Sequence, residues 1–202
     1  MRRVFFMCMD ASIAALALVP FFLFLSKKFF HDNKRAMGYA VFSVYLCAMF
    51  AVVGLPDICY VRFHPNINLR PFAYMFSDFA NSFLNVVLFV PLGFFLPLFW
   101  RTFRKFWSTI LFGLCLSAFV EVLQIFTFRA TDVNDLLTNT LGSFVGWCFG
   151  RLALRFIPGI CPEERNKWLW IVCISTFLCM FFLHPFMEKL VWFLIYQIAK
   201  LR

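Results

Sequence analysis

Six polar side chains stand close together in an otherwise apolar part of the chain. They are Glu121, Gln124, Arg129, Asp132, Asp135 and Asn139. A lone carboxylate at the centre of a membrane-spanning helix costs about 2.5–3.5 kcal/mol on insertion scales, so the membrane tolerates it only when it is protonated, paired or hydrated. Holding two helices together needs only one or two polar contacts, whereas this cluster has six polar side chains. We therefore interpret the cluster as a hydrated polar cleft, with helix association as the simpler alternative.

The acids of this cluster could support catalysis. Asp132 and Asp135 are one helical turn apart and could hold a divalent cation, with Asn139 as a further oxygen ligand. A partly buried Glu121 could act as a general acid or base. Glu121, Asp132 and Asp135 are therefore the candidate catalytic residues of an intramembrane enzyme. Glu121 could instead be the proton or ion site of a lipid transporter or flippase.

Binding without catalysis is the interpretation we favour. The guanidinium groups of Arg129 and Arg70 could hold a phosphate or carboxylate. The amides and acids could bind sugar hydroxyls or peptide amines. The sequence has no Ser-His-Asp arrangement, no phosphate-binding glycine loop and no H-E-x-x-H motif. Binding of this kind requires no cofactor.

The composition shows what kind of protein positions these residues. The chain has 202 residues, of which 63% are hydrophobic and 14% are charged, whereas a soluble domain is about half apolar and a quarter charged. The formal charge of +9 could indicate nucleic-acid binding in a soluble protein. Here the basic residues flank apolar runs, as in membrane proteins. We therefore expect an integral membrane protein whose partners include membrane lipids and exclude nucleic acid.

Apolar runs of about 20 residues predict the membrane-spanning helices. Six runs qualify: 4–26, 36–58, 79–100, 106–128, 133–157 and 168–186. The tail, 187–202, has apolar residues at helical spacing and predicts an amphipathic helix on the membrane surface. The predicted fold is an all-α polytopic membrane protein with about six spanning helices and a C-terminal interfacial helix. Three segments follow: two helices in 1–60, a three-helix core with an outward loop in 61–157, and the C-terminal helix and tail in 158–202.

The distribution of basic residues predicts the orientation. Loops 27–35, 101–105 and 151–167 together hold eleven Lys and Arg, against eight on the other side. Since cytoplasmic loops carry the excess of basic residues, these three loops are predicted to be cytoplasmic. The loop 59–78 and the turn 129–132 then face outward, together with the polar cluster. Both chain termini are also placed outside; alternatively the first run is re-entrant, which puts the N-terminus inside and leaves the rest unchanged.

Regular spacing puts polar and small residues on one face of each of two neighbouring helices. The fifth span presents Asp132, Asp135, Asn139, Gly142, Gly146 and Gly150, and the fourth presents Gly113, Ser117, Glu121 and Gln124. The glycines and the serine predict close helix packing. A short turn joins the two spans, so we expect these faces to meet. Asn85 of the third span adds a polar group at its outward end.

Several short motifs occur in a fixed order between residues 68 and 155. They are N-L-R-P-F at 68–72, N-V-V-L-F-V-P-L-G-F-F-L-P-L at 85–98, R-T-F-R-K at 101–105, E-V-L-Q at 121–124 and R-x-x-D-V-N-D-L-L-T-N-T-L-G at 129–142. In order and spacing the chain resembles the VanZ-like family of bacterial membrane proteins. Two positions depart from the family pattern: Phe128 replaces a glycine and Asn134 replaces an acid. Asn134 lies off the polar face, and we take it to be dispensable.

The resemblance implies a role in the bacterial cell envelope. The founding member of the family is associated with resistance to the lipoglycopeptide teicoplanin and leaves peptidoglycan precursor chemistry alone. The family's characteristic polar positions correspond to Asn85, Glu121, Gln124, Arg129, Asp132, Asp135 and Asn139 of this chain. The resemblance thus implies a multi-pass protein of the cytoplasmic membrane that confers low-level glycopeptide resistance. The implied partners are a lipid-linked cell-wall precursor, a lipoteichoic-type polymer or a lipoglycopeptide.

Overall fold

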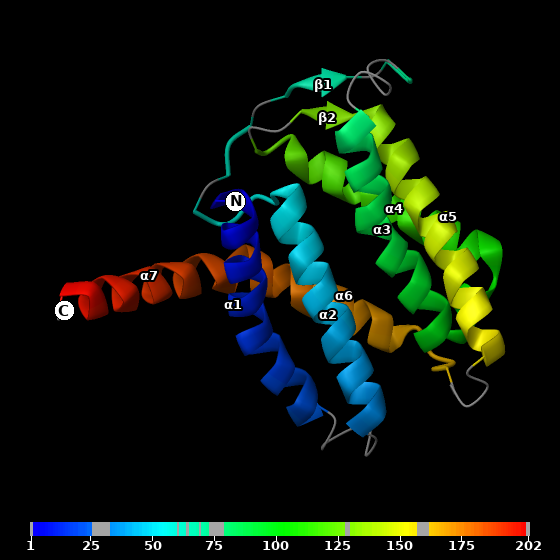
Figure 1. The fold of residues 1–202 in the computed structure, drawn as a ribbon, viewed down its shortest axis with the longest axis horizontal. Helices are drawn as coiled ribbons and strands as arrows, with labels where there is room; N and C mark the ends of the chain where they lie inside the picture. Colours follow the sequence, from blue (N-terminus) through cyan, green and yellow to red (C-terminus); the bar gives the residue numbers. More distant parts are fainter. Residues whose placement is uncertain are drawn as a thin grey trace. The chain divides into compact units, whose positions relative to one another are not determined.

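Helices make up most of the regular structure of the chain (Figure 1). The structure is a computed structural model that describes residues 2–25, 33–59, 61–63, 65–68, 70–72, 79–127, 130–156 and 162–200. The long helices are α1 (Arg2–Leu25), α2 (Asn33–Val53), α3 (Phe79–Phe99), α4 (Phe106–Gln124), α5 (Val133–Phe156), α6 (Lys167–Leu178) and α7 (His184–Lys200). The short elements are β1 (Ile67–Asn68), β2 (Thr131–Asp132), the 3₁₀-helix η2 (Arg101–Arg104) and the π-helix η3 (Cys179–Leu183).

The predicted helical membrane fold is confirmed. Among the described residues, four helical stretches are long and apolar enough to cross a membrane: Arg35–Val53, Phe79–Phe99, Phe106–Gln124 and Lys167–Leu194. The apolar part of α1, Ser12–Leu25, is shorter. Helix α5 has 24 residues but begins with polar turns, and it is not among the four. That six helices cross the membrane stays a prediction.

The chain divides into two compact units, and the first comprises Met1–Val61 and Trp170–Arg202. Its core forms where α1 packs on α2. Buried side chains on α1 recur every four residues, at Ala14, Leu18 and Phe22, which places them on one helical face. Phe42 and Leu46 are fully buried on α2.

The C-terminal helices differ from the prediction because the predicted break between the last spanning helix and the tail helix is absent. A spanning helix ending at 186 was predicted, followed by a separate tail helix. Instead, α6 continues through η3 into α7 without a break, as Figure 1 shows. The widened π turn leaves the carbonyl of Phe181 to accept a hydrogen bond from the Ile58 amide at 3.1 Å. Apolar residues extend to Leu194, so nothing in the sequence ends the helix at 186.

The second unit, Arg62–Leu169, contains α3, α4 and α5 and holds the predicted site. Helix α5 packs most extensively on α3, and the contacts run in the same direction along both helices. A Cβ added at Gly142 would overlap the carbonyl oxygen of Val86, and one at Gly146 would overlap that of Val90. The glycines therefore permit close packing, as predicted. Their partner is α3, however, and the expectation that this part of the α5 face meets α4 is wrong.

The polar part of the α5 face does meet α4. Ser143 lies against Gly113, where an added Cβ would overlap the serine hydroxyl oxygen. Gly93 of α3 packs on the backbone of Ser143 in turn. Residues around Ser143 therefore contact both neighbouring helices, and α5 is the central element of this unit.

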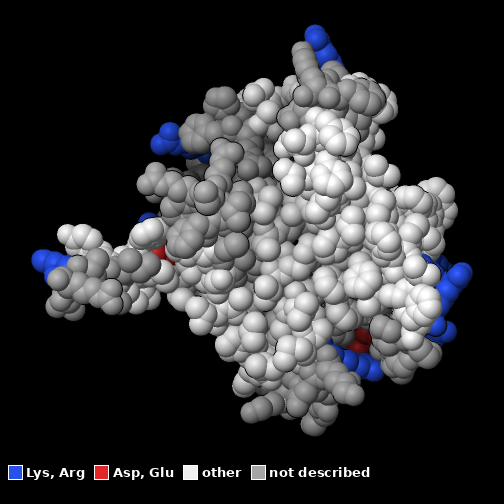
Figure 2. Space-filling view, viewed as in Figure 1, with Lys and Arg blue, Asp and Glu red and all other residues white. Residues whose placement is uncertain are grey.

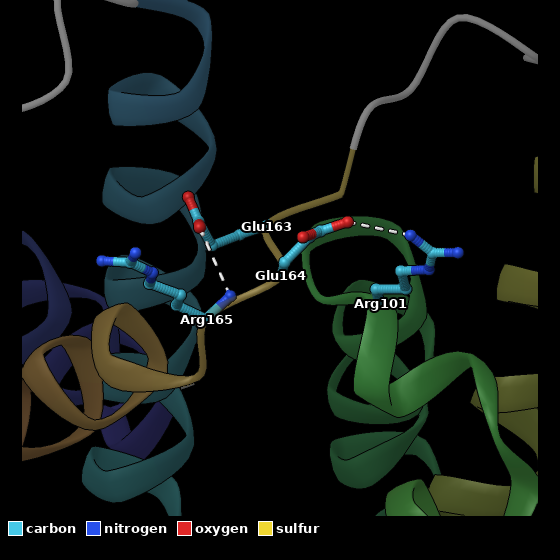
Figure 3. A network of polar contacts seen from close by, with 4 residues as sticks. All are labelled: Arg101, Glu163, Glu164 and Arg165. Carbon is cyan, nitrogen blue, oxygen red and sulfur yellow. Dashed lines mark hydrogen bonds and ion pairs between the residues drawn. The ribbon is translucent and has the colours of Figure 1, made fainter.

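The connection between α5 and α6 attaches to the end of α3 (Figure 3). The Glu163 amide donates to the Phe99 carbonyl at 2.7 Å, and the Arg101 amide donates to the Glu163 carbonyl at 3.0 Å. The Arg101 guanidinium also pairs with the Glu164 carboxylate at 2.8 Å. These bonds satisfy backbone groups where α3 ends. The exposed ion pair itself contributes little.

We expect Gly146→Ala to destabilise the protein by roughly 1–3 kcal/mol, because the added methyl group meets the backbone of α3. Thermal unfolding of the purified protein in detergent measures the change. Cys148→Ala is the control, since Cys148 is exposed on the same helix. If Gly146→Ala unfolded at the same temperature as Cys148→Ala, the close packing of α5 on α3 would be refuted.

Candidate functional site

The turn between α4 and α5 brings Glu121 and Asp132 together. The Glu121 carboxylate accepts a hydrogen bond from the Asp132 amide at 2.9 Å, and the Thr131 hydroxyl donates to the Glu121 carbonyl at 3.0 Å. Glu121 is only 7% exposed. A bond between an ionised acceptor and a backbone amide is stronger than a neutral one. The contact therefore offsets part of the cost of placing a carboxylate inside a membrane protein.

Helix α4 ends at Gln124, four residues before the predicted end. The amides of Phe126 and Thr127 bond to the carbonyls of Leu123 and Gln124 at 3.0 Å each, which tightens the chain into a turn. The Thr127 hydroxyl also bonds to the Gln124 carbonyl at 3.0 Å. Local side-chain bonding of this kind competes with helix continuation. The early end leaves room for β2 before α5 begins.

Two short strands cover the end of the three-helix unit, as Figure 1 shows. β1 pairs in parallel with β2, with Ile67 opposite Thr131 and Asn68 opposite Asp132. The Thr131 amide donates to the Asn66 carbonyl at 2.9 Å. The Asn68 side-chain amide donates to the Asp132 carboxylate at 3.0 Å. The loop before α3 is therefore fixed to the start of α5.

Asn134 makes the most connections to this loop, which the prediction that it is dispensable did not anticipate. Its side chain is 4% exposed. Its side-chain nitrogen donates to the Arg70 backbone carbonyl at 3.3 Å, and its side-chain oxygen accepts from the Phe72 backbone amide at 2.6 Å. A carboxylate in this position could accept but not donate. Asn134 therefore binds a donor and an acceptor of the loop, which explains why an amide serves here.

Phe72 has a strained backbone at the end of this contact. Its φ is 63°, in the left-handed region, which costs a bulky residue about 1–3 kcal/mol. The hydrogen bond from its amide to Asn134 holds this conformation. Its ring is 65% exposed, so packing of the side chain does not account for the strain.

Asp132 has both carboxylate oxygens engaged by the protein. One oxygen accepts from the amide and side-chain nitrogens of Asn134, at 2.9 Å each, and the other accepts from Asn68. The bond to the Asn134 amide caps the first turn of α5, where the helix dipole also favours an acid. Within the part of the chain that the structure describes, no three His, Cys, Asp or Glu residues are grouped to hold a metal ion. This arrangement suits a structural acid better than a metal ligand.

A second polar layer lies deeper between the helices. The Asn139 side-chain amide nitrogen donates to the Ser117 hydroxyl at 2.9 Å, and the Ser143 hydroxyl donates to the Asn139 carbonyl at 3.1 Å. Asn139 is 3% exposed and Ser117 is fully buried. The predicted meeting of the α4 and α5 faces is therefore confirmed for these polar residues.

Asn85 stands near this layer on α3. Val86, the next residue, contacts Gly142, so along the parallel pair Asn85 lies within about one helical turn of Asn139. The amide nitrogen of Asn85 and the amide oxygen of Asn139 are buried and make no hydrogen bond with described residues. An unpaired buried polar atom costs about 1–3 kcal/mol. One donor and one acceptor near this level are thus left without a partner among the described residues.

The other predicted residues surround these two layers. Gln124 is buried and Asp135 is half-buried in the first turn of α5. Arg70 is exposed, and its guanidinium forms no ion pair with described residues. Arg129 lies outside the described residues. Sequence reasoning missed Asn66, Asn68 and Asn134 as loop-fixing residues, although the asparagine-rich N-I-N-L-R-P-F run was a usable signal.

Comparison with known proteins gives a consistent family match. A family model described as VanZ/LLP1 matches residues 37–154, which include every residue of the two polar layers. Over 82 residues the chain is 37% identical to Protein VanZ of Enterococcus faecium, an alignment covering 40% of this chain and 50% of that protein. The chain thus matches half the length of this relative. No solved structure matches.

We expect Asn134→Ala to release the loop at residues 66–72 from α5, because it removes a donor and an acceptor at once. The expected loss is about 1–3 kcal/mol of stability and faster hydrogen exchange at the amides of Phe72 and Thr131. Asn81→Ala is the control, because Asn81 is exposed on α3. Unchanged exchange in Asn134→Ala would contradict the role assigned to this side chain.

Proposed function

Because the chain belongs to the VanZ/LLP1 family, we propose that it confers low-level resistance to glycopeptide and lipoglycopeptide antibiotics such as teicoplanin. In this proposal it does so by binding a lipid-linked or lipidated ligand at the polar site between α3, α4 and α5. The observation that carries the proposal is the unpaired donor of Asn85 near the unpaired acceptor of Asn139. A hydroxyl or amide of a ligand could satisfy both atoms.

The rim of the site suits the charged part of such a ligand. The Arg70 backbone is fixed through Asn68 and Asn134, while its guanidinium is exposed. A guanidinium can hold a phosphate or carboxylate by two hydrogen bonds, and Arg129 could add a second. Asp135 supplies negative charge toward a cationic glycopeptide. The ligand could therefore be a cell-wall precursor, a lipoteichoic-type polymer or the antibiotic itself.

The location follows from the charge bias of the loops. With 101–105 and 151–167 in the cytoplasm, the N-terminal end of α5 faces outward. We therefore propose a multi-pass protein of the bacterial cytoplasmic membrane whose polar site opens to the outer leaflet. Lipid-linked wall precursors and lipoglycopeptides are both reached from that side.

Metal-assisted catalysis has less support than binding. Both oxygens of Asp132 already accept hydrogen bonds from Asn68 and Asn134. A cation at Asp132 and Asp135 would have to share the Asp132 carboxylate with these bonds and with the cap of α5. Transport has no specific observation in its favour.

Asn139→Leu should abolish teicoplanin protection, because it removes the amide while keeping the side-chain volume. Expression in a susceptible bacterial host and measurement of the minimum inhibitory concentration test this, with membrane levels of each variant measured in parallel. Thr140→Val is the control, since Thr140 is the next residue and its hydroxyl bonds only within α5. Full protection by Asn139→Leu at normal membrane levels would overturn the proposed site.

Glu121→Gln tests the charge separately from the fold. The glutamine oxygen can still accept from the Asp132 amide, so we expect the melting temperature to stay close to that of the wild type. Protection should fall toward the value of the host without the protein if the negative charge contributes to binding. Protection equal to wild type would remove Glu121 from the binding site.

Calcium and magnesium titrations separate binding from metal-assisted catalysis. We expect that neither ion binds saturably to the purified protein at a site that depends on the Asp135 carboxylate. The Asp135→Asn variant should therefore give the same titration curve as the wild type. The measurement is isothermal titration calorimetry on both proteins. Saturable binding in the wild type that this substitution removes would favour the enzyme and count against the present proposal.

A further inference from the structure

Phe72 occupies a backbone conformation that normally selects glycine. Its φ is 63°, where the Cβ atom of an L-residue crowds the backbone. The other positive φ among the described residues belongs to a glycine, Gly54, at 67°, and glycine adopts this conformation without steric cost. A phenylalanine at position 72 therefore needs a reason that outweighs the strain.

The fold does not supply that reason. The Phe72 ring is 65% exposed and contacts no ring of a described residue. Phe63, earlier in the same loop, is 71% exposed but still packs on Phe126, with ring centroids 5.9 Å apart. For the stability of the fold alone, glycine would be the better residue at position 72.

The fold does fix the backbone at this position. The Asn134 side chain is 4% exposed; it accepts from the Phe72 backbone amide at 2.6 Å and donates to the Arg70 backbone carbonyl at 3.3 Å. Pro71 lies between these two contacts, and its ring restricts φ. The segment is thereby tied to the first turn of α5. A buried side chain that holds a strained residue in place specifies the direction of its Cα–Cβ bond, an arrangement found where proteins clamp ligands.

Anchoring in the bilayer would not require this arrangement. Phe79 and Phe83 are 66% and 55% exposed at the start of α3, on ordinary helical backbone. Aromatic side chains are common at the membrane surface, and fluid lipid accepts a ring in any direction. Lipid contact therefore explains why a phenylalanine is exposed but not why it stands on a strained backbone. A partner with a fixed geometry of its own explains both.

The neighbouring residues indicate the chemistry of that partner. Asn66 and Arg70 are exposed in the same loop, and Asn68 is half-buried. A single aromatic ring among amide and guanidinium groups matches a sugar, which has an apolar face of C–H groups for stacking and hydroxyls at its edge for hydrogen bonds. In the view of Figure 2, the end of this unit that carries β1 and β2 shows basic but no acidic surface. The visible charge on this face therefore favours a sugar that carries a phosphate.

We propose that the Phe72 ring stacks on a sugar ring in the head group of the ligand. Under the proposed function, which this role presupposes, the remainder of the same molecule occupies the polar site between α3, α4 and α5. The contact with the sugar then offsets the strain at Phe72, and it forms without first ordering the loop. Among the ligands considered above, a lipid-linked wall precursor with a sugar-phosphate head fits these features.

Two substitutions of Phe72 separate stability from function. Phe72→Gly relieves the strain, so its unfolding temperature in detergent should equal that of the wild type or exceed it by up to about 4 °C. Phe72→Leu keeps the strain and an apolar side chain but lacks the flat ring. At wild-type membrane levels, both variants should lose teicoplanin protection, measured as the minimum inhibitory concentration. Phe79→Leu is the control and should retain protection, because Phe79 is exposed on unstrained backbone.

Saturation-transfer difference NMR tests the sugar contact directly. The probe is N-acetylglucosamine 1-phosphate, added to the full-length protein in lipid nanodiscs. We expect saturable transfer to the sugar-ring protons from the wild type, with roughly tenfold weaker binding to Phe72→Gly and Phe72→Leu. Glycerol 1-phosphate has the same charge but no ring, so its signal should be the same with all three proteins. Undetectable binding of the sugar phosphate to the wild type, or equal binding to Phe72→Leu, would overturn the proposal.

The result for Phe72 is distinguishable from that for the polar site. If Asn139→Leu abolished protection while both Phe72 variants kept protection and probe binding, the sugar contact alone would be wrong. If the wild type gave no protection but bound the probe through Phe72, the proposed function would fail and the sugar contact would stand. An unfolding temperature of Phe72→Gly below that of the wild type would show that the ring supports the fold, and would also overturn the proposal.

Discussion

The hydrogen bond from the Asp132 amide to the Glu121 carboxylate is the contact on which the end of the three-helix unit where α5 begins depends. Where a helix begins, its first amides have no hydrogen-bond partner within the helix. In a membrane protein there is little water to serve as that partner. Glu121 of α4 satisfies the Asp132 amide, and the Asp132 side chain satisfies the Asn134 amide. The same Asp132 carboxylate accepts from Asn68. One residue thus joins α4, α5 and the loop before α3.

The close packing of α5 on α3 follows a different constraint. Parallel neighbours cannot be joined by a short turn, so α3 and α5 are held by their own contact surface. The glycines at 142 and 146 let the backbones touch, which gives many weak contacts where apolar burial offers no advantage over lipid. This packing leaves the Asn139 side of α5 directed toward Ser117 of α4. The glycine stripe and the polar layer therefore have separate partners, and each helix interface has its own chemistry.

The sequence was sufficient to predict the helical membrane fold from hydropathy and the family from its motifs. Helical spacing also predicted that the polar faces of α4 and α5 meet, as the Asn139–Ser117 bond shows. The family match at 37–154 is wider than the motifs at 68–155 suggested at its N-terminal side. Spacing could not identify the partner of a helical face: it put the glycines of α5 against α4, whereas they contact α3. Nor could it reveal Asn134, whose role depends on the Arg70 and Phe72 backbones more than sixty residues away.

The polar residues divide into those that build the site and those that remain available to a ligand. Asp132 and Asn134 use their side-chain atoms to fix the loop and cap α5, so altering them changes the shape of the site before it changes any contact with a ligand. Three groups make no hydrogen bond or ion pair with described residues: the Arg70 guanidinium, the Asn85 side-chain nitrogen and the Asn139 side-chain oxygen. In the proposed function, a cation at the rim would meet an anionic group of the ligand, and the neutral donor and acceptor would meet a hydroxyl or amide. The bonds of Asp132 and Asn134 would then limit how far the loop and the start of α5 must reorganise on binding.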